Sequence, residues 1–131
     1  WWRAAAGVLE HGKLLAIDYG LTGEEQISPA RVQGTLRAYH RHHVNDDLLS
    51  NVGEQDLTAH VNFTEIQKTG ETAGLKPENF CTQPQFLSRI LAAAMKKGFF
   101  NEWDARQTRQ FQTLTHPEHL GRAFRVLVQA R

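Results

Sequence analysis

Two neighbouring stretches of the sequence, residues 34–44 and 56–63, are dense in side chains that can do chemistry. They combine imidazole, guanidinium and carboxylate groups, which can exchange protons, hold ions and form ion pairs. The groups are those of His40, His42, His43, His60, Arg37, Arg41 and Asp56. This density predicts either a functional site or a polar network that locks the two stretches together.

The clustered histidines raise the question of a metal site. On an extended segment, alternation of side chains places His40 and His42 on one face and His43 on the other. A zinc site needs three or four converging ligands, and neither a cysteine pair nor a His-Glu-x-x-His helix accompanies these histidines. We therefore expect no bound metal, and we expect one or two of the imidazoles to hydrogen-bond Asp46 or Asp56.

Asp18 lies at the end of a short apolar run, residues 13–19, between Gly12 and Gly20. Such a run predicts a strand buried on both faces, as in a parallel sheet. Ligands of open α/β sheets bind beyond the carboxyl ends of the strands, where Asp18 could orient a cationic substrate. Its carboxylate could equally cap a loop by accepting from backbone amides. Arg37 leaves a similar choice between a clamp for a carboxylate and a structural ion pair.

Motifs for covalent or nucleotide chemistry are not found in the sequence. It contains no Gly-x-Ser-x-Gly, no Gly-x-Gly-x-x-Gly and no phosphate-binding loop. The lone Cys81 is interpreted as a buried thiol at the end of a strand, and a single cysteine fits a reducing, cytoplasmic compartment. Gln83, at a strand-to-helix junction, either faces a ligand or caps the helix.

Composition narrows the class of protein. The chain has 131 residues and a net charge of +1, which suits one domain and argues against a nucleic-acid binder, since such a protein would show a basic stripe. No apolar run approaches the length of about 20 residues that a membrane-spanning helix needs.

Hydrophobic periodicity and capping signals give the order of the elements. We expect strands at 13–19, 76–82 and 123–130, helices at 1–9, 62–74, 84–98 and 101–115, a loop at 21–33, and an extended hairpin arm at 35–44. The helix after Asn62 has a capping-box pattern with Glu65. The second of the long helices carries a stripe expected to be core, namely Phe86, Leu87, Ile90, Leu91 and Ala94. Strands that alternate with helices predict an α/β sheet.

The beginning of the chain suggests a piece of a longer protein. It starts Trp1-Trp2-Arg3, and its only methionine is Met95. Large aromatic side chains normally belong in a core, and three core strands make a thin sheet. We therefore expect an N-terminal part of the fold to precede this chain.

Six spaced blocks of the sequence resemble the MidA-like family of S-adenosylmethionine-dependent methyltransferases. This family includes a mitochondrial respiratory complex I assembly factor that methylates arginine. The blocks are Leu15-Ala-Ile-Asp-Tyr-Gly20; Gly34-Thr-Leu-Arg37 with His40; Gly53; Asp56-Leu-Thr-Ala-His-Val-Asn-Phe63; Thr82-Gln83 with Phe86-Leu87; and Gly121 with Phe124-Arg-Val-Leu127. They run in family order across nearly the whole chain.

The resemblance implies a fold and a cofactor. The chain would be the C-terminal part of a Rossmann-like methyltransferase sheet, with residues 13–19 as a central parallel strand, the last two strands as an antiparallel edge pair, and helices on both sides. The loop that holds S-adenosylmethionine would lie in the preceding part. We therefore expect no cofactor-binding residues in this chain and only weak binding of S-adenosylmethionine by it.

The resemblance also implies a substrate and site residues. The acceptor would be an arginine of a protein, which is a complex I subunit for the mitochondrial relative. Methyl transfer requires alignment of donor and acceptor and removal of a proton. The catalytic residues would be Asp18 and His60. The substrate-binding residues would be Tyr19, Thr35, Arg37 and His40.

Two other functions remain open, and one association is expected. The chain could be a non-catalytic protein-binding module on a degenerate methyltransferase fold, or a histidine-based metal hydrolase. Whatever the function, residues 13–19 would expose a strand edge if the fourth strand of the family sheet is absent. Exposed apolar edges pair with other chains, so we expect self-association through this strand.

Overall fold

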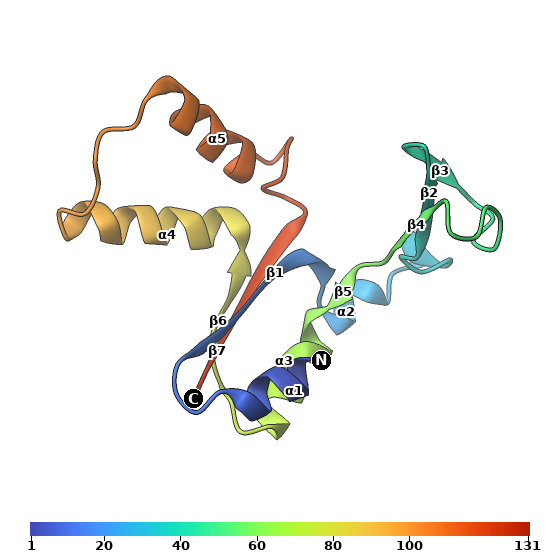
Figure 1. The fold of residues 1–131 in the computed structure, drawn as a ribbon, viewed down its shortest axis with the longest axis horizontal. Helices are drawn as coiled ribbons and strands as arrows, with labels where there is room; N and C mark the ends of the chain where they lie inside the picture. Colours follow the sequence, from blue (N-terminus) through green and yellow to red (C-terminus); the bar gives the residue numbers. More distant parts are fainter.

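The computed structural model describes the backbone of residues 1–131 and every side chain except that of residue 30. Its strands form a four-stranded sheet in the order β5-β1-β7-β6 and a three-stranded sheet in the order β3-β2-β4. The small sheet stands clear of the main sheet, beyond the end of β1 (Figure 1). The strands are β1 Lys13–Leu21, β2 Arg37–His40, β3 His43–Asn45, β4 Asp56–Thr58, β5 Val61–Asn62, β6 Lys76–Thr82 and β7 Phe124–Ala130.

The last strand, β7, holds the main sheet together. It pairs antiparallel with β1 on one side and with β6 on the other. The three strands predicted from the sequence are therefore present, and β6 and β7 form the expected antiparallel pair. In the sheet order, β7 lies between β1 and β6. The predicted parallel pairing of β1 is limited to Gly20 and Leu21, which pair with β5.

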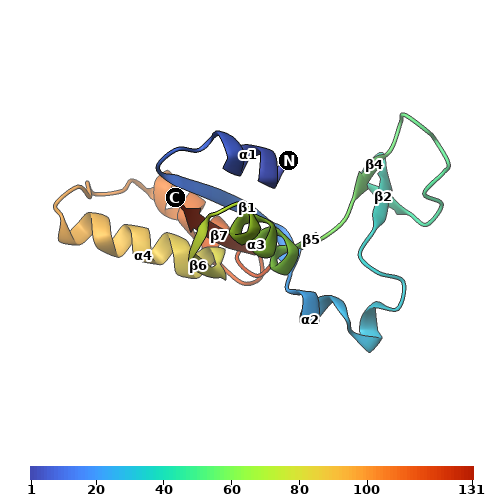
Figure 2. The ribbon, with the colours of Figure 1, turned by 90° about the horizontal axis from the view of Figure 1, so that it is seen from below.

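Helices cover the two faces of the main sheet unequally. The helices are α1 Trp2–Val8, α2 Gly23–Gln26, α3 Phe63–Thr72, α4 Gln83–Lys96 and α5 Ala105–Thr115, with a short 3₁₀ turn η1 at Pro29–Arg31. One face packs Trp2, Phe63 and Leu127 into a buried cluster under α1 and α3, and the other packs Val126 and Val128 against α4. Figure 2 shows α1 and α4 on opposite sides of the sheet.

A buried glutamine joins the sheet to two helices. The Gln129 side chain is fully buried in β7. Its Oε1 accepts from Trp2 Nε1 at 2.8 Å, and its Nε2 donates to the carbonyl of Gln67 in α3 at 3.0 Å. Gly70 lets α3 approach this closely, because a Cβ there would collide with the Gln129 amide. One polar side chain thereby satisfies its own hydrogen bonds and fixes α1 and α3 on the sheet.

The expectation that residues 13–19 are buried on both faces is wrong for this chain. Leu14 and Ala16 pack against the cluster under α1. On the other face, Leu15 and Ile17 are 49% and 43% exposed. The reason is coverage, because α4 contacts β6 and β7 and does not extend over β1. The apolar run predicted the strand correctly, but the second covering layer is not formed by the residues described.

Local capping signals predicted the long helices, and one of them begins later than expected. Asn62 Oδ1 accepts from Glu65 N, so the predicted cap of α3 is present, although only in this one direction. The expected start of α5 at residue 101 is wrong, because Asp104 caps the helix and forms a full capping box with Gln107. The expected loop at 21–33 contains α2 and η1. No helix in the described chain is long and apolar enough to cross a bilayer.

The small sheet contains a hairpin, but the expectation that residues 35–44 form one extended arm is wrong, because the turn lies within them. His40 pairs with His43, and Arg41 and His42 form the tight turn between them with φ of 49° and 67°. Positive φ at both turn positions matches the twist of the adjoining strands. His42 is therefore a turn residue, and the expectation that it shares a strand face with His40 is wrong.

Replacement of the buried glutamine tests its structural role. Gln129→Leu keeps the volume but leaves Trp2 Nε1 and the Gln67 carbonyl without partners, which we expect to destabilise the chain by about 2 kcal/mol. Urea unfolding measures the free-energy difference. Gln112→Leu, at an exposed position of α5, is the matched control and should change stability little. Equal stability of the two variants would contradict the role given to Gln129.

Candidate functional site

A cavity of about 480 Å³ lies where the two sheets meet. We call it the junction cavity. Its walls combine hydroxyl, phenol, imidazole and guanidinium groups with the apolar faces of aromatic rings. The lining residues are Tyr19, Thr35, Arg37, Tyr39, Thr58, His60 and Ala123. This position, at the carboxyl end of β1, is where open α/β sheets bind their ligands.

Pairing in the small sheet explains why these side chains converge. Arg37 pairs with Thr58, and Arg37 and Tyr39 share a face because they are two residues apart in β2. Thr35 Oγ1 accepts from the backbone N–H of His60 at 3.1 Å, which joins the segment before β2 to the segment after β4. One face of the small sheet is thus directed at the main sheet.

The main sheet contributes an aromatic pair to the cavity. Tyr19 in β1 lies opposite Phe124 in β7, with ring centroids 4.0 Å apart and planes tilted by 40°. Contact of this kind restrains the tyrosine ring. Asp18, the neighbour of Tyr19, belongs to the opposite face of β1, and its Oδ1 accepts from the Tyr19 backbone N–H at 2.7 Å. This is the backbone-capping alternative considered for Asp18 from the sequence.

The structure brings together four of the six residues predicted for the site. They are Tyr19, Thr35, Arg37 and His60. Asp18 and His40 do not line the cavity. His40 lies on the other face of β2, where its Nδ1 is 3.1 Å from the Glu54 carbonyl oxygen. That partner is a backbone carbonyl, so His40 is not one of the imidazoles expected to bond Asp46 or Asp56.

Three lining residues were missed by the sequence interpretation. Tyr39 could have been found from Arg37, because residues two apart on a strand share a face. Thr58 required the register between β2 and β4, and Ala123 required the position of β7 beside β1. Gln83, which the sequence left between ligand and cap, is buried, and its Nε2 donates to the Leu114 carbonyl at 2.7 Å.

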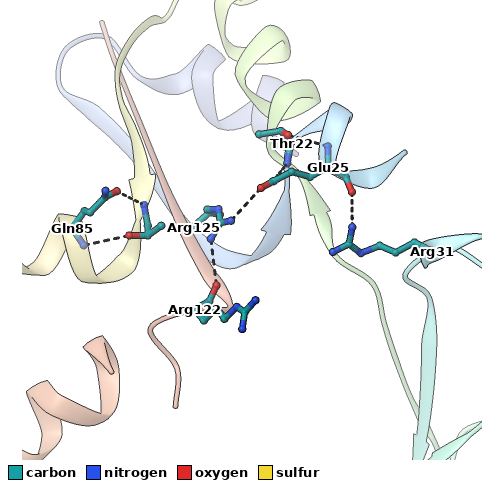
Figure 3. A network of polar contacts seen from close by, with 7 residues as sticks. Thr22, Glu25, Arg31, Gln85, Arg122 and Arg125 are labelled. Carbon is teal, nitrogen blue, oxygen red and sulfur yellow. Dashed lines mark hydrogen bonds and ion pairs between the residues drawn. The ribbon is translucent and has the colours of Figure 1, made fainter. Parts of the chain in front are cut away.

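A network around Glu25 holds the first residues beyond β1 (Figure 3). Glu25 Oε2 accepts from Thr22 N at 2.8 Å, and Oε1 lies 3.4 Å from Arg125 Nη2. Arg31 Nη1 donates to the Glu25 carbonyl at 2.7 Å. The chain leaves the main sheet here and continues to the small sheet. The network therefore braces the segment that positions the small-sheet wall of the junction cavity.

The charge of Glu25 is stabilised in this setting. The largest cause is the hydrogen bond from the Thr22 backbone N–H, which lowers the pKa of the carboxyl. Partial burial acts in the opposite direction, and the positive charge of Arg125 lowers the pKa further. The pKa of Glu25 is lowered as the net result.

Metal-binding geometry is not found in the described side chains. No group of three or more histidine, cysteine, aspartate and glutamate residues among them is arranged to hold an ion. His40, Arg41, His43 and Asp47 do line a common hollow of about 530 Å³ on the outer side of the hairpin.

Comparison with protein families identifies the chain. Residues 1–81 match a family described as "Putative S-adenosyl-L-methionine-dependent methyltransferase". The chain belongs to this methyltransferase family. All residues that line the junction cavity, except Ala123, fall within the matched part.

Two solved structures resemble this methyltransferase family member over almost its whole length. One is an uncharacterised superfamily protein from Burkholderia thailandensis, with 30% identity, a TM-score of 0.82, and coverage of 99% of this chain and 36% of the other. The second, from the same organism, is described as a "likely methyl transferase" bound to S-adenosyl-homocysteine, with 29% identity, a TM-score of 0.78, and coverage of 99% and 34%. The chain thus spans about a third of these structures. No curated protein matches it.

The junction cavity of the family member does not fit S-adenosylmethionine. That cofactor carries a sulfonium and an ammonium cation, whereas the junction cavity contains Arg37 and no carboxylate. Three amides at the strand-to-helix junctions are also already bonded to threonine hydroxyl groups. Gly23 N donates to Thr64 Oγ1, Glu25 N to Thr22 Oγ1, and Gln85 N to Thr82 Oγ1. The junction cavity is therefore suited to a different ligand.

The acid dependence of stability tests the Glu25 network. Because its pKa is lower in the folded chain, Glu25 contributes stability above its unfolded pKa, and the contribution is lost as pH falls through the lowered value. Glu25→Gln should therefore be less stable than wild type near neutral pH, and the difference should shrink in acid. Urea unfolding across the acid range measures this. Glu24→Gln, in the same helical turn without the arginine partner, is the control; an unchanged stability of Glu25→Gln near neutrality would refute the role.

Proposed function

We propose that this chain forms the substrate side of an S-adenosylmethionine-dependent methyltransferase with a Rossmann-like sheet, as the C-terminal part of its catalytic domain. The observation that carries the proposal is the junction cavity, which collects Tyr19, Thr35, Arg37 and His60 at the carboxyl end of β1. Its lining falls almost entirely within the residues that match the family. The lack of fit to the cofactor supports the proposal that this cavity holds the methyl acceptor.

We propose further that the acceptor is an arginine side chain of a protein, as the resemblance to the MidA-like family implies. The rings of Tyr19 and Tyr39 offer faces on which a guanidinium can stack. Thr35 and Thr58 offer hydroxyl groups for its N–H donors. Arg37 would then bind a carbonyl or an acidic side chain of the same protein next to the target, since its charge repels the target itself.

His60 is the residue best suited to proton removal in this cavity. A neutral imidazole has one ring nitrogen without a proton, which can accept the proton of a reacting group. The backbone of His60 is anchored by Thr35 at 3.1 Å, which restricts where the ring can lie. We propose that His60 takes the proton that the acceptor loses, and that Asp18 serves to hold the Tyr19 backbone. The cytoplasm, which suits the free Cys81 thiol, is the compartment we propose.

A second acceptor class is favoured by the charge of the cavity. Arg37 is present and no carboxylate lines the walls, so an acceptor with a carboxylate would be bound through a bidentate ion pair. Transfer to such a group gives a base-labile methyl ester, whereas transfer to arginine gives a methylated guanidinium that is stable to mild base. Mass spectrometry before and after mild base distinguishes the two products.

Substitutions in the cavity of the complete methyltransferase test the proposed function. His60→Ala should lower turnover about a hundredfold or more, and Arg37→Ala should raise KM for the acceptor. Neither should change the affinity for S-adenosyl-homocysteine, measured by calorimetry. Arg106→Ala, on the exposed face of α5, is the control. Equal losses of turnover and cofactor affinity would place these residues in the cofactor site or in general stability, and unchanged turnover would refute the proposal.

We also propose that β1 pairs with a second copy of this chain. Gly12 and Arg131 exchange both backbone hydrogen bonds, so alternation directs the N–H groups of residues 13, 15, 17 and 19 away from β7. Asp18 covers the last of these at Tyr19. The others lie on an edge that β5 meets only at Gly20 and Leu21.

Proline substitution on this edge tests the association. Leu15→Pro removes a donor that faces the free edge, a position where proline is tolerated, and it should give a folded monomer. Leu15→Thr keeps the donor and the strand propensity, and it should associate like wild type. Sedimentation equilibrium measures the mass. A monomeric wild type, or association of the proline variant with unchanged affinity, would sink the proposal.

A further inference from the structure

A second cavity, of about 400 Å³, lies between α4 and the segment that leads into α5. We call it the helical groove. Figure 1 shows these two helices near each other on the β6 side of the main sheet, away from the small sheet. Most of the surface of the helical groove is apolar. The lining residues are Leu87, Ile90, Leu91, Ala94, Phe99, Phe100, Asn101, Glu102, Trp103, Gln107 and Phe111.

One wall of the helical groove is aliphatic and comes from α4. It contains the stripe that the sequence interpretation assigned to the core. Only Phe86 of that stripe packs against the buried cluster at β7. Ile90 is 51% exposed and lines the groove, so the assignment to core is wrong for this residue. The stripe provides an extended apolar track instead of a fully covered face.

The opposite wall is aromatic. Phe100 and Trp103 have ring centroids 5.2 Å apart at an interplanar angle of 61°, and Trp103 and Phe111 are 5.0 Å apart at 50°. Rings set at such steep angles form corners and do not stack flat. Phe99, which is 78% exposed, extends this wall. Corners of aromatic rings are the arrangement that attracts compact cations through the ring faces.

The charge of the groove has one sign. Glu102 is the charged residue among those that line it, and within the described part of the chain no ion pair is formed by Glu102. Lys96 and Lys97 follow α4 closely in sequence but do not line the groove. A carboxylate beside aromatic faces, without a lining cation, is complementary to a positively charged ligand.

We propose that the helical groove binds a quaternary ammonium head carried on an aliphatic stem. The head lies against Phe100, Trp103 and Phe111 with Glu102 beside it, and the stem follows Leu87, Ile90 and Leu91. A methylated head suits this site better than a bare ammonium because it loses less hydration when it contacts aromatic rings. A purely apolar ligand would leave the carboxylate without a partner.

The inference is independent of the proposed methyl transfer. The helical groove shares no lining residue with the junction cavity. It also lies outside the residues that match the methyltransferase family. Failure of either proposal therefore leaves the other standing.

A matched pair of small probes tests the charge requirement. Choline carries a trimethylammonium head, and its uncharged analogue has carbon in place of nitrogen with the same shape. Titrations of each into the full chain, followed by the NMR signal of the Trp103 indole N–H, give the two affinities. We expect choline to bind about tenfold more tightly than the analogue.

Variants locate the binding. Glu102→Gln and Trp103→Leu should each weaken choline binding about tenfold, with the Trp103 variant followed by calorimetry. Trp1→Leu, at a position that is 81% exposed and outside the groove, should bind choline like wild type. Circular dichroism checks that each variant is folded. Equal binding of the two probes, no binding of choline, or unchanged affinity of Glu102→Gln would overturn the proposal.

Discussion

The pairing of β7 with both of its neighbours is the interaction on which the rest of the molecule depends. Every residue from Phe124 to Gln129 has a second role beyond the ladder. Leu127 and Gln129 lie on the face toward α1 and α3, and the Gln129 side chain bonds both of these helices. Arg125, on the same face, forms an ion pair with Glu25 of α2. On the other face, Val126 and Val128 lie in the cluster that Phe86 of α4 packs against, and the ring of Phe124 contacts that of Tyr19. Because a strand alternates its faces, one segment from the end of the sequence organises both layers and one wall of the candidate site.

Sequence patterns predicted the elements well where the signal is local. The strands at Lys13–Leu21 and Phe124–Ala130 follow from apolar runs, and the cap at Asn62 follows from its residue type and its spacing to Glu65. The turn at His42 was missed because it has no glycine, and non-glycine residues seldom take positive φ. Burial of β1 was overestimated because burial depends on a covering layer, and an apolar run does not show whether that layer is present.

The candidate site was predicted in part, and the strand alternation explains which part. Tyr19 and Asp18 are neighbours in sequence, so only one of them can face the junction cavity. The same rule separates Arg37, which lines it, from His40, which does not. Sequence resemblance groups such residues together because they occur in one block. The face on which each side chain lies is set by the alternation along the strand. Residues that a family match places in one site can therefore lie on opposite faces of a strand, as Asp18 and Tyr19 do.

The small sheet has a thin core, and this has a consequence for how the chain fluctuates. Within residues 37–58, Ala38 is the one residue classed as buried, so little apolar contact opposes separation of its strands. Elements of this kind open locally at a lower free energy than the strands of a central sheet. Amide hydrogen exchange should therefore be much faster in β2 to β4 than in β7. A wall that opens and closes in this way would admit a bulky polymer chain to the junction cavity without any disturbance of the main sheet.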